Sequence, residues 1–375
     1  MIYLDHAATS YPKPAPVREA ILACLAAGGN PGRSGHRLAI WAEERIWDAR
    51  ERIADLFHTA DASRVVFTVN ATMALNVAIK GLARPRTRVL TSSFEHNSVT
   101  RPLWAMKDVT WTAIAPTDDS PIDLDLLEQE LRKGGVAMVV VSHASNVTGA
   151  VVPLAQIRSL TGGYEVPLVL DASQTAGHLP VRAEAGEVLV FPGHKGLFGP
   201  QGTGGMVVGD GITLHPLVEG GTGGRSESPR QPRWLPHALE AGTPNSVGIA
   251  GLGAAVQWLT ECGIEAIMMR EASLRAHFIA RLRAIPRLTV HDWASETTVP
   301  VVSIAFDDMP AAEAAARLEE RADVIVRAGL HCAPLAHRTL GTLPAGTVRF
   351  GLSHLTDLSE LESALDAVAD LAGKQ

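Results

Sequence analysis

The chain has 375 residues, of which 46% are hydrophobic and 19% charged, a composition typical of a globular protein and not of a disordered or fibrous one. Its formal net charge of -7 and the lack of any basic run of five residues argue against a nucleic-acid partner. No apolar stretch reaches the roughly 18 residues that a membrane span needs, and the N-terminal residues have neither the basic nor the apolar region of a signal peptide.

The three cysteines, Cys24, Cys262 and Cys332, cannot form a disulfide framework, because one thiol would always be left over. A reducing cytoplasmic compartment is therefore expected. Cys24 and Cys262 lie among apolar or helical neighbours, and we expect both to behave as small, inert hydrophobic side chains.

Short apolar runs alternate with amphipathic stretches through the first two-thirds of the chain. Apolar residues at helical spacing predict helices over 42–57, 71–82 and 123–132. The apolar runs predict strands over 64–68, 88–91, 136–142, 167–171 and 187–191. Strands separated by helices in this way favour a mainly parallel sheet with helices on both faces.

The pattern changes after residue 245. Helices are predicted over 247–262, 264–285, 311–321 and 358–371, and one strong strand over 301–306. We expect a large α/β domain over 14–245 and a smaller α+β domain made of 1–13 and 246–375. The Pro- and Gly-containing segment 236–245 marks the predicted boundary.

Lys195 and Asp171 each follow a predicted strand, and ligands of open parallel sheets bind at the carboxyl ends of the strands. Lys195 lies between glycines, and a lysine in a dry, tight site readily loses its proton, as Schiff-base chemistry requires. A carboxylate such as Asp171, placed against the ring nitrogen of pyridoxal 5'-phosphate (PLP), makes that cofactor an electron sink. Alone, Asp171 could equally be a helix cap and Lys195 a surface lysine.

Ten segments, in order along the chain, resemble those of the class V aminotransferase family, and within it the cysteine desulfurase and selenocysteine lyase group. They are YLDHAATS (3–10), NPGRSGHRLA (30–39), FTVNATMALN (67–76), FEHNSV (94–99), SHASNVTG (142–149), LDASQTAGHLP (170–180), FPGHKGLFGPQGTGG (191–205), EAGTPN (240–245), RAGLHCAPL (327–335) and RFGLSHLT (349–356). The chain is most similar to a cysteine-desulfurase-like branch. The resemblance implies an α/β fold of the PLP-dependent transferase type I, with a seven-stranded, mainly parallel sheet and a smaller C-terminal α+β domain.

The resemblance also assigns residues to the cofactor phosphate. Ala71 and Thr72, at a predicted helix start, would offer it a backbone amide and a hydroxyl, since helix N-termini favour anions. His194 would reach the phosphate from beside Lys195. Thr243 would reach the phosphate of the neighbouring protomer, which implies a homodimer with shared active sites.

Further residues are assigned to the ring and to the substrate. His96 would stack on the pyridine ring and move protons, and Asn146 and Gln174 would bond the phenolic side of the cofactor. Arg349, together with Asn146, would bind the substrate, because a planar guanidinium makes two parallel hydrogen bonds to an α-carboxylate. Without the resemblance, His96 reads as an ordinary loop histidine and Arg349 as a surface arginine.

Cys332 decides which reaction the resemblance implies. It lies in a predicted loop beside His331, where a partly exposed thiol can act as a nucleophile. In a cysteine desulfurase, Lys195 removes the α-proton of L-cysteine, Cys332 takes the sulfur as a persulfide, and L-alanine is released. The persulfide is then passed to a sulfur-acceptor protein or to a small thiol. No metal ligands are predicted.

Three positions depart from the common family pattern. Pro192 replaces a serine and removes both a hydroxyl and a backbone donor, His6 stands where asparagine is common, and Asn97 replaces a histidine after His96. The first and last of these also occur in the branch that the chain resembles.

Other functions remain open at this point. A selenocysteine lyase or a C–S β-lyase acting on a cysteine conjugate would need Lys195, Asp171 and Arg349 but not Cys332. A nucleotide-binding oxidoreductase would carry a G-x-G-x-x-G motif after its first strand, and this chain has no such motif there. A non-catalytic protein of the same fold would not need all four of these residues.

Overall fold

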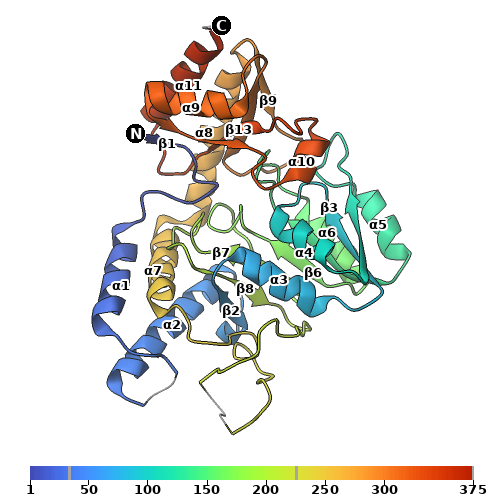
Figure 1. Cartoon of the computed structure of the whole chain (residues 1–375), viewed down its shortest axis with the longest axis vertical. Helices are drawn as coiled ribbons and strands as arrows, with labels where there is room; N and C mark the ends of the chain where they lie inside the picture. Colours follow the sequence, from blue (N-terminus) through green and yellow to red (C-terminus); the bar gives the residue numbers. More distant parts are fainter. Residues whose placement is uncertain (33–34, 224–226, 374–375) are drawn as a thin grey trace.

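In the computed structural model, which describes residues 1–32, 35–223 and 227–373, the apolar runs of the first two-thirds of the chain form one seven-stranded sheet (Figure 1). The strand order is β2-β8-β7-β6-β5-β3-β4, and β8 is antiparallel to both neighbours while the other pairs are parallel. The strands are β2 (Val65–Thr68), β3 (Thr87–Ser92), β4 (Val109–Ile114), β5 (Val136–Ser142), β6 (Leu168–Asp171), β7 (Glu187–Pro192) and β8 (Gly204–Val208). The predicted mainly parallel sheet is confirmed.

Helices cover both faces of this sheet because successive strand residues point to opposite sides. Val139 and Val141 of β5 belong to the core on one face, whereas Met138 and Val140 belong to the core on the other. The helices of this unit are α1 (Ala15–Ala27), α2 (Arg37–Leu56), α3 (Ala71–Leu82), α4 (Asn97–Ala105), α5 (Leu124–Arg132), α6 (Leu154–Gly163) and α7 (Ser246–Cys262), with a 3-10 turn η1 (Ala62–Arg64). Helix α2 begins earlier than predicted, because the His36 side chain caps it by accepting the Ala39 N–H.

The C-terminal third builds a second, four-stranded antiparallel sheet in the order β12-β13-β10-β9. Its strands are β9 (Leu288–His291), β10 (Val301–Phe306), β12 (Arg327–Gly329) and β13 (Thr347–Gly351), and its helices are α8 (Ile264–Arg283), α9 (Ala311–Ala322), α10 (Pro334–Thr339) and α11 (Leu358–Gly373). The N-terminal strand β1 (Ile2–Tyr3) pairs in parallel with β11 (Val324–Ile325), so the start of the chain lies with this smaller unit (Figure 1).

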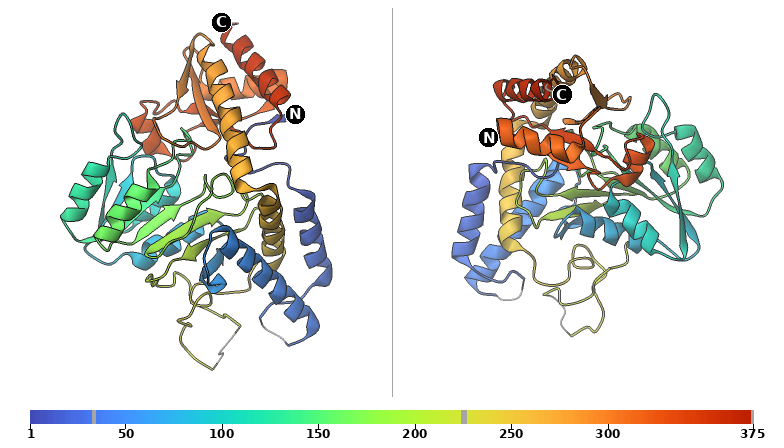
Figure 2. Two further views of the ribbon diagram at one scale, coloured as in Figure 1. Left: turned by 180° about the vertical axis from the view of Figure 1, so that it is seen from behind. Right: turned by 45° about the horizontal axis from the view of Figure 1, so that its top comes forward.

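Helices α7 and α8 connect the two units (Figure 2). They meet at Gly263 with a 77° bend. Although α7 follows the predicted boundary at residue 245, it packs against α1 and α2, and its apolar residues join the core of the large unit. The exact boundary stays a prediction.

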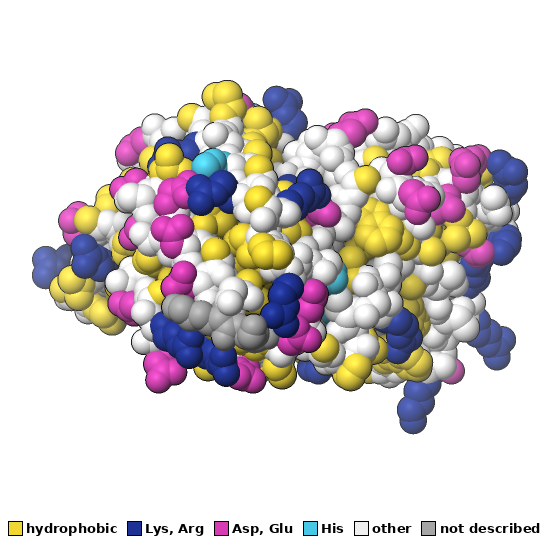
Figure 3. Space-filling view, turned by 90° about the horizontal axis from the view of Figure 1, so that it is seen from above, with side chains coloured by type: hydrophobic (Ala, Val, Ile, Leu, Met, Phe, Trp, Pro, Cys, Tyr) yellow, Lys and Arg dark blue, Asp and Glu magenta, His cyan; other side chains and the backbone are white. Residues whose placement is uncertain are grey.

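Among the described helices, none is by itself both long and apolar enough for a membrane span, and only the bent pair α7 and α8 meets the test when taken together. Seen from the end that carries the small unit, the surface intersperses acidic and basic side chains with apolar ones (Figure 3).

Candidate active site

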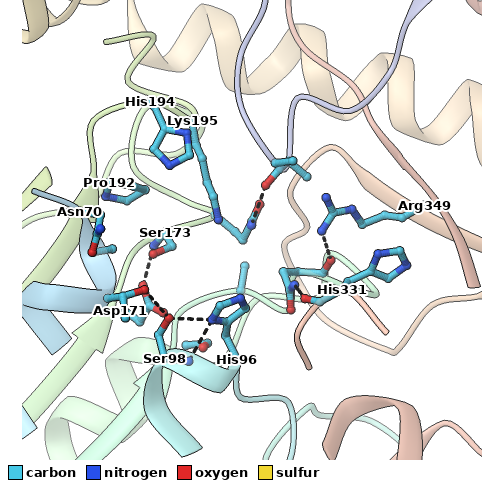
Figure 4. A pocket seen from close by; sticks show the side chains of 18 of the residues that line it. Asn70, His96, Ser98, Asp171, Ser173, Pro192, His194, Lys195, His331 and Arg349 are labelled. Atoms are coloured by element: carbon cyan, nitrogen blue, oxygen red, sulfur yellow. Dashed lines mark hydrogen bonds between the residues drawn. The ribbon is translucent and has the colours of Figure 1, made fainter. Parts of the chain in front are cut away.

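A cavity of about 220 Å³ lies at the carboxyl ends of the central strands, where both units contribute side chains (Figure 4). We call it the cofactor cavity. It is lined by Ala7, Ala8, Asn70, Ala71, Thr72, His96, Ser98, Ser142, Ala144, Asn146, Asp171, Ser173, Gln174, Pro192, His194, Lys195, Arg327, His331 and Arg349. Nine of the residues predicted from the sequence are among them: Ala71, Thr72, His96, Asn146, Asp171, Gln174, His194, Lys195 and Arg349.

Lys195 extends into this cavity from the turn that follows β7 (Figure 4). Burial lowers the pKa of its ammonium to about 8, and the attraction of Asp171 opposes that change only in part. Asp171 ends β6 and is itself buried, with the Ser173 N–H donating to its Oδ1 at 2.9 Å. Burial raises the pKa of the Asp171 carboxyl. The cavity thus holds a readily neutralised amine opposite a carboxylate.

The start of α3 forms another wall of the cavity. The Asn70 side chain caps this helix by accepting the Met73 N–H at 2.9 Å, and Ala71 and Thr72 follow as its first residues. Gly204 of β8 packs so tightly here that a Cβ atom would lie 2.8 Å from the Asn70 carbonyl carbon. A glycine is therefore required for the helix start to approach the sheet, and its N-terminus suits an anion.

His96 caps α4, whose Ser98 hydroxyl lies 2.7 Å from the Thr72 hydroxyl at the start of α3. Its Nδ1 accepts the Ser98 N–H at 3.0 Å and lies 2.9 Å from the Ser98 hydroxyl, which assigns the proton of the neutral ring to Nε2. Burial, with a smaller contribution from Lys195, lowers the pKa of His96 to about 3. The imidazole is therefore neutral near pH 7, as expected of a ring that stacks on a planar group.

Glu95, which precedes it, is fully buried and anchors this loop. Its carboxylate accepts hydrogen bonds from the hydroxyl of Ser92 at 2.6 Å and from the hydroxyl of Ser142 at 2.7 Å. Burial raises the pKa of Glu95 to about 7. The loop that carries His96 is thereby tied to the ends of β3 and β5.

Arg349 enters from β13 of the small unit and is 1% exposed. Its Nη2 donates to Asp5 Oδ1 at 3.0 Å and its Nη1 to the Asn146 carbonyl at 3.2 Å. Arg327 lies beside it in register on β12 and also lines the cavity. Within the described part of the chain, the Arg327 guanidinium has no hydrogen-bond or ion-pair partner. Two guanidinium groups thus line the cavity, that of Arg327 without a partner among the described residues and that of Arg349 with an unpartnered Nε.

The N-terminal segment holds the turn that carries Lys195. Four donors converge on the carbonyl oxygen of His194: the Ser10 N–H at 3.0 Å, the Ser10 hydroxyl at 3.2 Å, the Thr9 hydroxyl at 3.0 Å and the Lys13 ammonium at 3.0 Å. Burial lowers the pKa of Lys13 to about 8. The position of Lys195 therefore depends on residues of the N-terminal segment, about 180 positions earlier in the sequence.

Several buried side-chain atoms around the cavity have no partner of their own. They are Asn146 Oδ1, His194 Nδ1, His331 Nδ1 and Arg349 Nε. Buried polar atoms in proteins are normally hydrogen-bonded. Four such atoms around one cavity, together with a helix N-terminus, Lys195 and Asp171, fit a polar, anionic cofactor.

Cys332 and Thr243 do not line the cofactor cavity. Cys332 is exposed and lines an adjoining groove that shares Thr72, His96 and Ser98 with the cavity. Thr243 lines a separate depression of about 330 Å³ whose wall includes Trp47 and Val218, both partly exposed. Their predicted roles as nucleophile and as a contact across a dimer stay predictions.

The other two cysteines differ from one another. Cys24 is buried in α1, as a small apolar side chain would be. Cys262 is exposed at the end of α7, and partial burial together with Glu261 raises the pKa of its thiol. A thiol that holds its proton more tightly is a poorer nucleophile near pH 7.

The three departures from the family pattern all lie at or near the site. Pro192 ends β7 and lines the cavity. The Asn97 N–H donates to the Cys332 carbonyl at 2.7 Å, and His6 is buried with an unpartnered Nδ1. Residues 33 and 34 of the predicted motif at 30–39 lie outside the described residues.

The sequence prediction missed six polar residues that line the cavity: Asn70, Ser98, Ser142, Ser173, Arg327 and His331. Asn70 could have been found as an N-cap residue before an apolar run. Arg327 and His331 border the predicted Cys332 loop, but no local pattern indicates that this segment faces the large unit.

Comparisons with known proteins agree with this geometry. The Aminotransferase class-V family profile matches residues 2–363. A probable cysteine desulfurase of Methanothermobacter thermautotrophicus is 28% identical over 99% of this chain and 95% of its own length. The apo structure of a cysteine desulfurase from Thermococcus onnurineus superposes with a TM-score of 0.91 at 27% identity, over 100% of this chain and 95% of that one.

A second solved structure, the cysteine desulfurase CsdA from Escherichia coli in an S-sulfonic acid form, matches with a TM-score of 0.86 at 25% identity. It covers 99% of this chain and 94% of that one. The fold is that of the PLP-dependent transferases of type I, and the cofactor of the family is PLP. From the family match over nearly its whole length and the shared fold, the chain belongs to the class V aminotransferase family.

Proposed function

We propose that this protein is a PLP-dependent cysteine desulfurase that converts L-cysteine to L-alanine and carries the sulfur on Cys332. One observation carries the proposal: an exposed thiol lines a groove that shares three residues with the cavity holding Lys195. This arrangement supports a role for Lys195 as the cofactor lysine and for Cys332 as a second nucleophile on an adjoining surface.

Eight residues that line the cofactor cavity would hold PLP. Lys195 would bind it covalently, and Asp171 would bond its ring nitrogen. Ala71, Thr72 and His194 would hold the phosphate, His96 would stack on the ring, and Asn146 and Gln174 would lie at the phenolic oxygen. When bound, PLP supplies an electron sink next to the substrate Cα.

Side chains of the protein bind the substrate and move its protons. Arg349 binds the α-carboxylate of L-cysteine through parallel hydrogen bonds. Lys195, once released, takes the Cα proton as a neutral amine, a role that its lowered pKa of about 8 favours. His96 Nδ1 is occupied by Ser98, so we assign Nε2 to the substrate thiol.

The sulfur transfer balances without an external oxidant. The Cys332 thiolate attacks the substrate sulfur, an S–S bond forms and the C–S bond breaks, and its electron pair goes to Cβ. Protonation of that carbon and of Cα gives L-alanine. The persulfide on Cys332 is then delivered to a sulfur acceptor.

A homodimer with shared active sites is part of this proposal. The depression around Thr243 is lined by Trp47, Leu217 and Val218, which are 44%, 40% and 56% exposed. Apolar side chains gathered in this way suit a covered interface. We also propose a cytoplasmic location, which the three unpaired thiols support.

One observation favours a second candidate, a C–S β-lyase or selenocysteine lyase. Cys332 does not line the cofactor cavity itself, so the PLP chemistry could run without it. In that case Lys195, Asp171 and Arg349 would suffice to cleave a cysteine conjugate or selenocysteine.

Purified protein loaded with PLP and given L-cysteine separates these functions. A desulfurase forms alanine and a persulfide on Cys332, both measured after a single turnover, and Cys332→Ala loses the persulfide. Pyruvate in place of alanine, formed equally by Cys332→Ala, would establish the C–S β-lyase instead. No visible absorption band after PLP is added would contradict both.

A further inference from the structure

The groove beside Cys332 has a composition of its own. It encloses about 350 Å³ and opens to solvent next to the cofactor cavity. We call it the Cys332 groove, defined by Thr72, Asn76, Lys80, His96, Asn97, Ser98, Arg101, Pro102, Ala105 and Cys332. No acidic residue lines it, whereas two cationic ones, Lys80 and Arg101, do.

Both cations are exposed, and in the part of the chain that the structure describes neither has a hydrogen-bond or ion-pair partner. Lys80 lies in the last turn of α3, where a cation is stabilised by the helix dipole in any case. Arg101 lies in the middle of α4, where the helix dipole does not stabilise a cation. A chain of net charge -7 thus keeps a local excess of positive charge beside its one predicted nucleophilic thiol.

The backbone presents that thiol in a defined place. His331 and Cys332 have φ angles of 47° and 57°, a left-handed conformation that costs roughly 1–3 kcal/mol per non-glycine residue. The Asn97 N–H holds the Cys332 carbonyl at 2.7 Å, and the next residue, Ala333, packs with Phe94 and Val147. Surrounding contacts therefore fix a strained turn at the wall of the groove.

We propose that the Cys332 groove binds the sulfur acceptor, and that this acceptor is a small thiol carrying a carboxylate, which Lys80 and Arg101 attract. The inference rests on the proposed desulfurase function and names its second substrate. A volume of about 350 Å³ falls within the roughly 300–1,000 Å³ of small-molecule sites.

The transfer needs no further reactant. The acceptor thiolate attacks the outer sulfur of the Cys332 persulfide, a new S–S bond forms, and the Cys332 sulfur leaves as the thiolate. The acceptor departs as its own persulfide. The carboxylate stays on the two cations throughout and takes no part in the bond changes.

The test measures discharge of a preformed persulfide. The PLP enzyme is loaded once with L-cysteine, desalted, and mixed with 3-mercaptopropionate, 2-mercaptoethanol or cysteamine, which are anionic, neutral and cationic. Rates are corrected for the thiolate fraction of each thiol. We expect the anionic thiol to discharge the persulfide fastest, and added salt to remove much of that advantage, because exposed charges are screened.

Variants assign the effect to the groove. Lys80→Gln and Arg101→Gln are each expected to reduce the anionic thiol's advantage about two- to fivefold, as one exposed ion pair would. Lys107→Gln, an exposed lysine just after α4 that does not line the groove, is the matched control and should leave it unchanged.

Equal corrected rates for all three thiols would overturn the inference, as would discharge that requires a protein acceptor. An effect of the two variants on alanine formation and not on discharge would assign the cations to substrate entry instead. If no persulfide forms at all, the desulfurase proposal fails before the groove is tested, so the two failures are distinguishable.

Discussion

The cofactor cavity and the Cys332 groove adjoin, but they hold their side chains in opposite ways. In the cavity, Asp171 and Arg349 are buried and bonded to the protein, and burial shifts the pKa values of Lys195 and His96. In the groove, the thiol and both cations are exposed, and the cations have no partner among the described residues.

This difference teaches how one protein can separate two kinds of chemistry. Proton transfer at carbon depends on an amine that water exclusion has made less basic, so it belongs in the buried part. Delivery of sulfur requires a second molecule to reach the thiol, so it belongs where the surface is open. Neither environment would serve the other step.

The largest effect is expected from a substitution that disables the cofactor cavity and leaves the Cys332 groove unchanged. Lys195→Ala removes the amine that binds the cofactor and moves the Cα proton, so turnover of L-cysteine should fall by at least about a thousandfold. The visible absorption band of the lysine-bound cofactor should disappear, whereas Cys332→Ala should keep it. A Lys195→Ala protein with the band and the turnover intact would contradict the assignment.

Arg349→Lys sharpens the comparison within the cavity. The charge stays, but the two parallel hydrogen bonds to a carboxylate are lost, at about 1.5–3 kcal/mol, which corresponds to roughly a 10- to 100-fold rise in KM for L-cysteine. The kcat should change much less. Steady-state kinetics checks this, with Arg338→Lys, an exposed arginine outside the cavity, as control.

The pH dependence of cofactor capture reports the burial of Lys195 directly. A lysine attacks PLP only when neutral, so capture by the apoprotein should accelerate as pH rises. With a pKa of about 8, the neutral fraction grows roughly tenfold between pH 7 and 9 and then levels off. A rate that keeps rising tenfold per pH unit up to pH 10 would indicate an ordinary, solvated lysine.

The smallest effect is expected from a substitution in the N-terminal segment, which holds the turn that carries Lys195. Lys13→Met removes one of the four donors to the His194 carbonyl and should cost about 1 kcal/mol, or up to about fivefold faster release of the cofactor. Dissociation of PLP after dilution measures it. An equally faster release of PLP from Lys107→Met would mean that the effect comes from the lost positive charge and not from the lost hydrogen bond to the His194 carbonyl.

Much of this arrangement could be predicted from the sequence because its signals are local. The strands over 136–142 and 301–306 and the helix over 71–82 are predicted with the observed bounds, since each is an uninterrupted apolar or amphipathic run. Lys195 and Asp171 directly follow such strands.

What could not be predicted depends on contacts between distant segments. Strand β8 begins with Gly204 and Gly205, which read as a loop, yet a Cβ on Gly205 would lie 2.5 Å from the Val66 carbonyl oxygen. Arg327 and His331 reach the cavity from the small unit's side, and no local pattern shows which way that segment faces. Packing between distant segments, and not local strand or turn propensity, decides the conformation and orientation of these residues.

The N-terminal segment has a consequence for how the protein is made. It is translated before the segments that it contacts, because β1 pairs with β11 and Asp5 bonds Arg349, both far later in the sequence. Contacts so far apart in sequence form slowly and late. The nascent seven-stranded sheet and its PLP-binding residues can therefore fold while the cavity still lacks Arg349, and we expect translation arrested at residue 320 to give a chain that retains PLP but binds L-cysteine poorly.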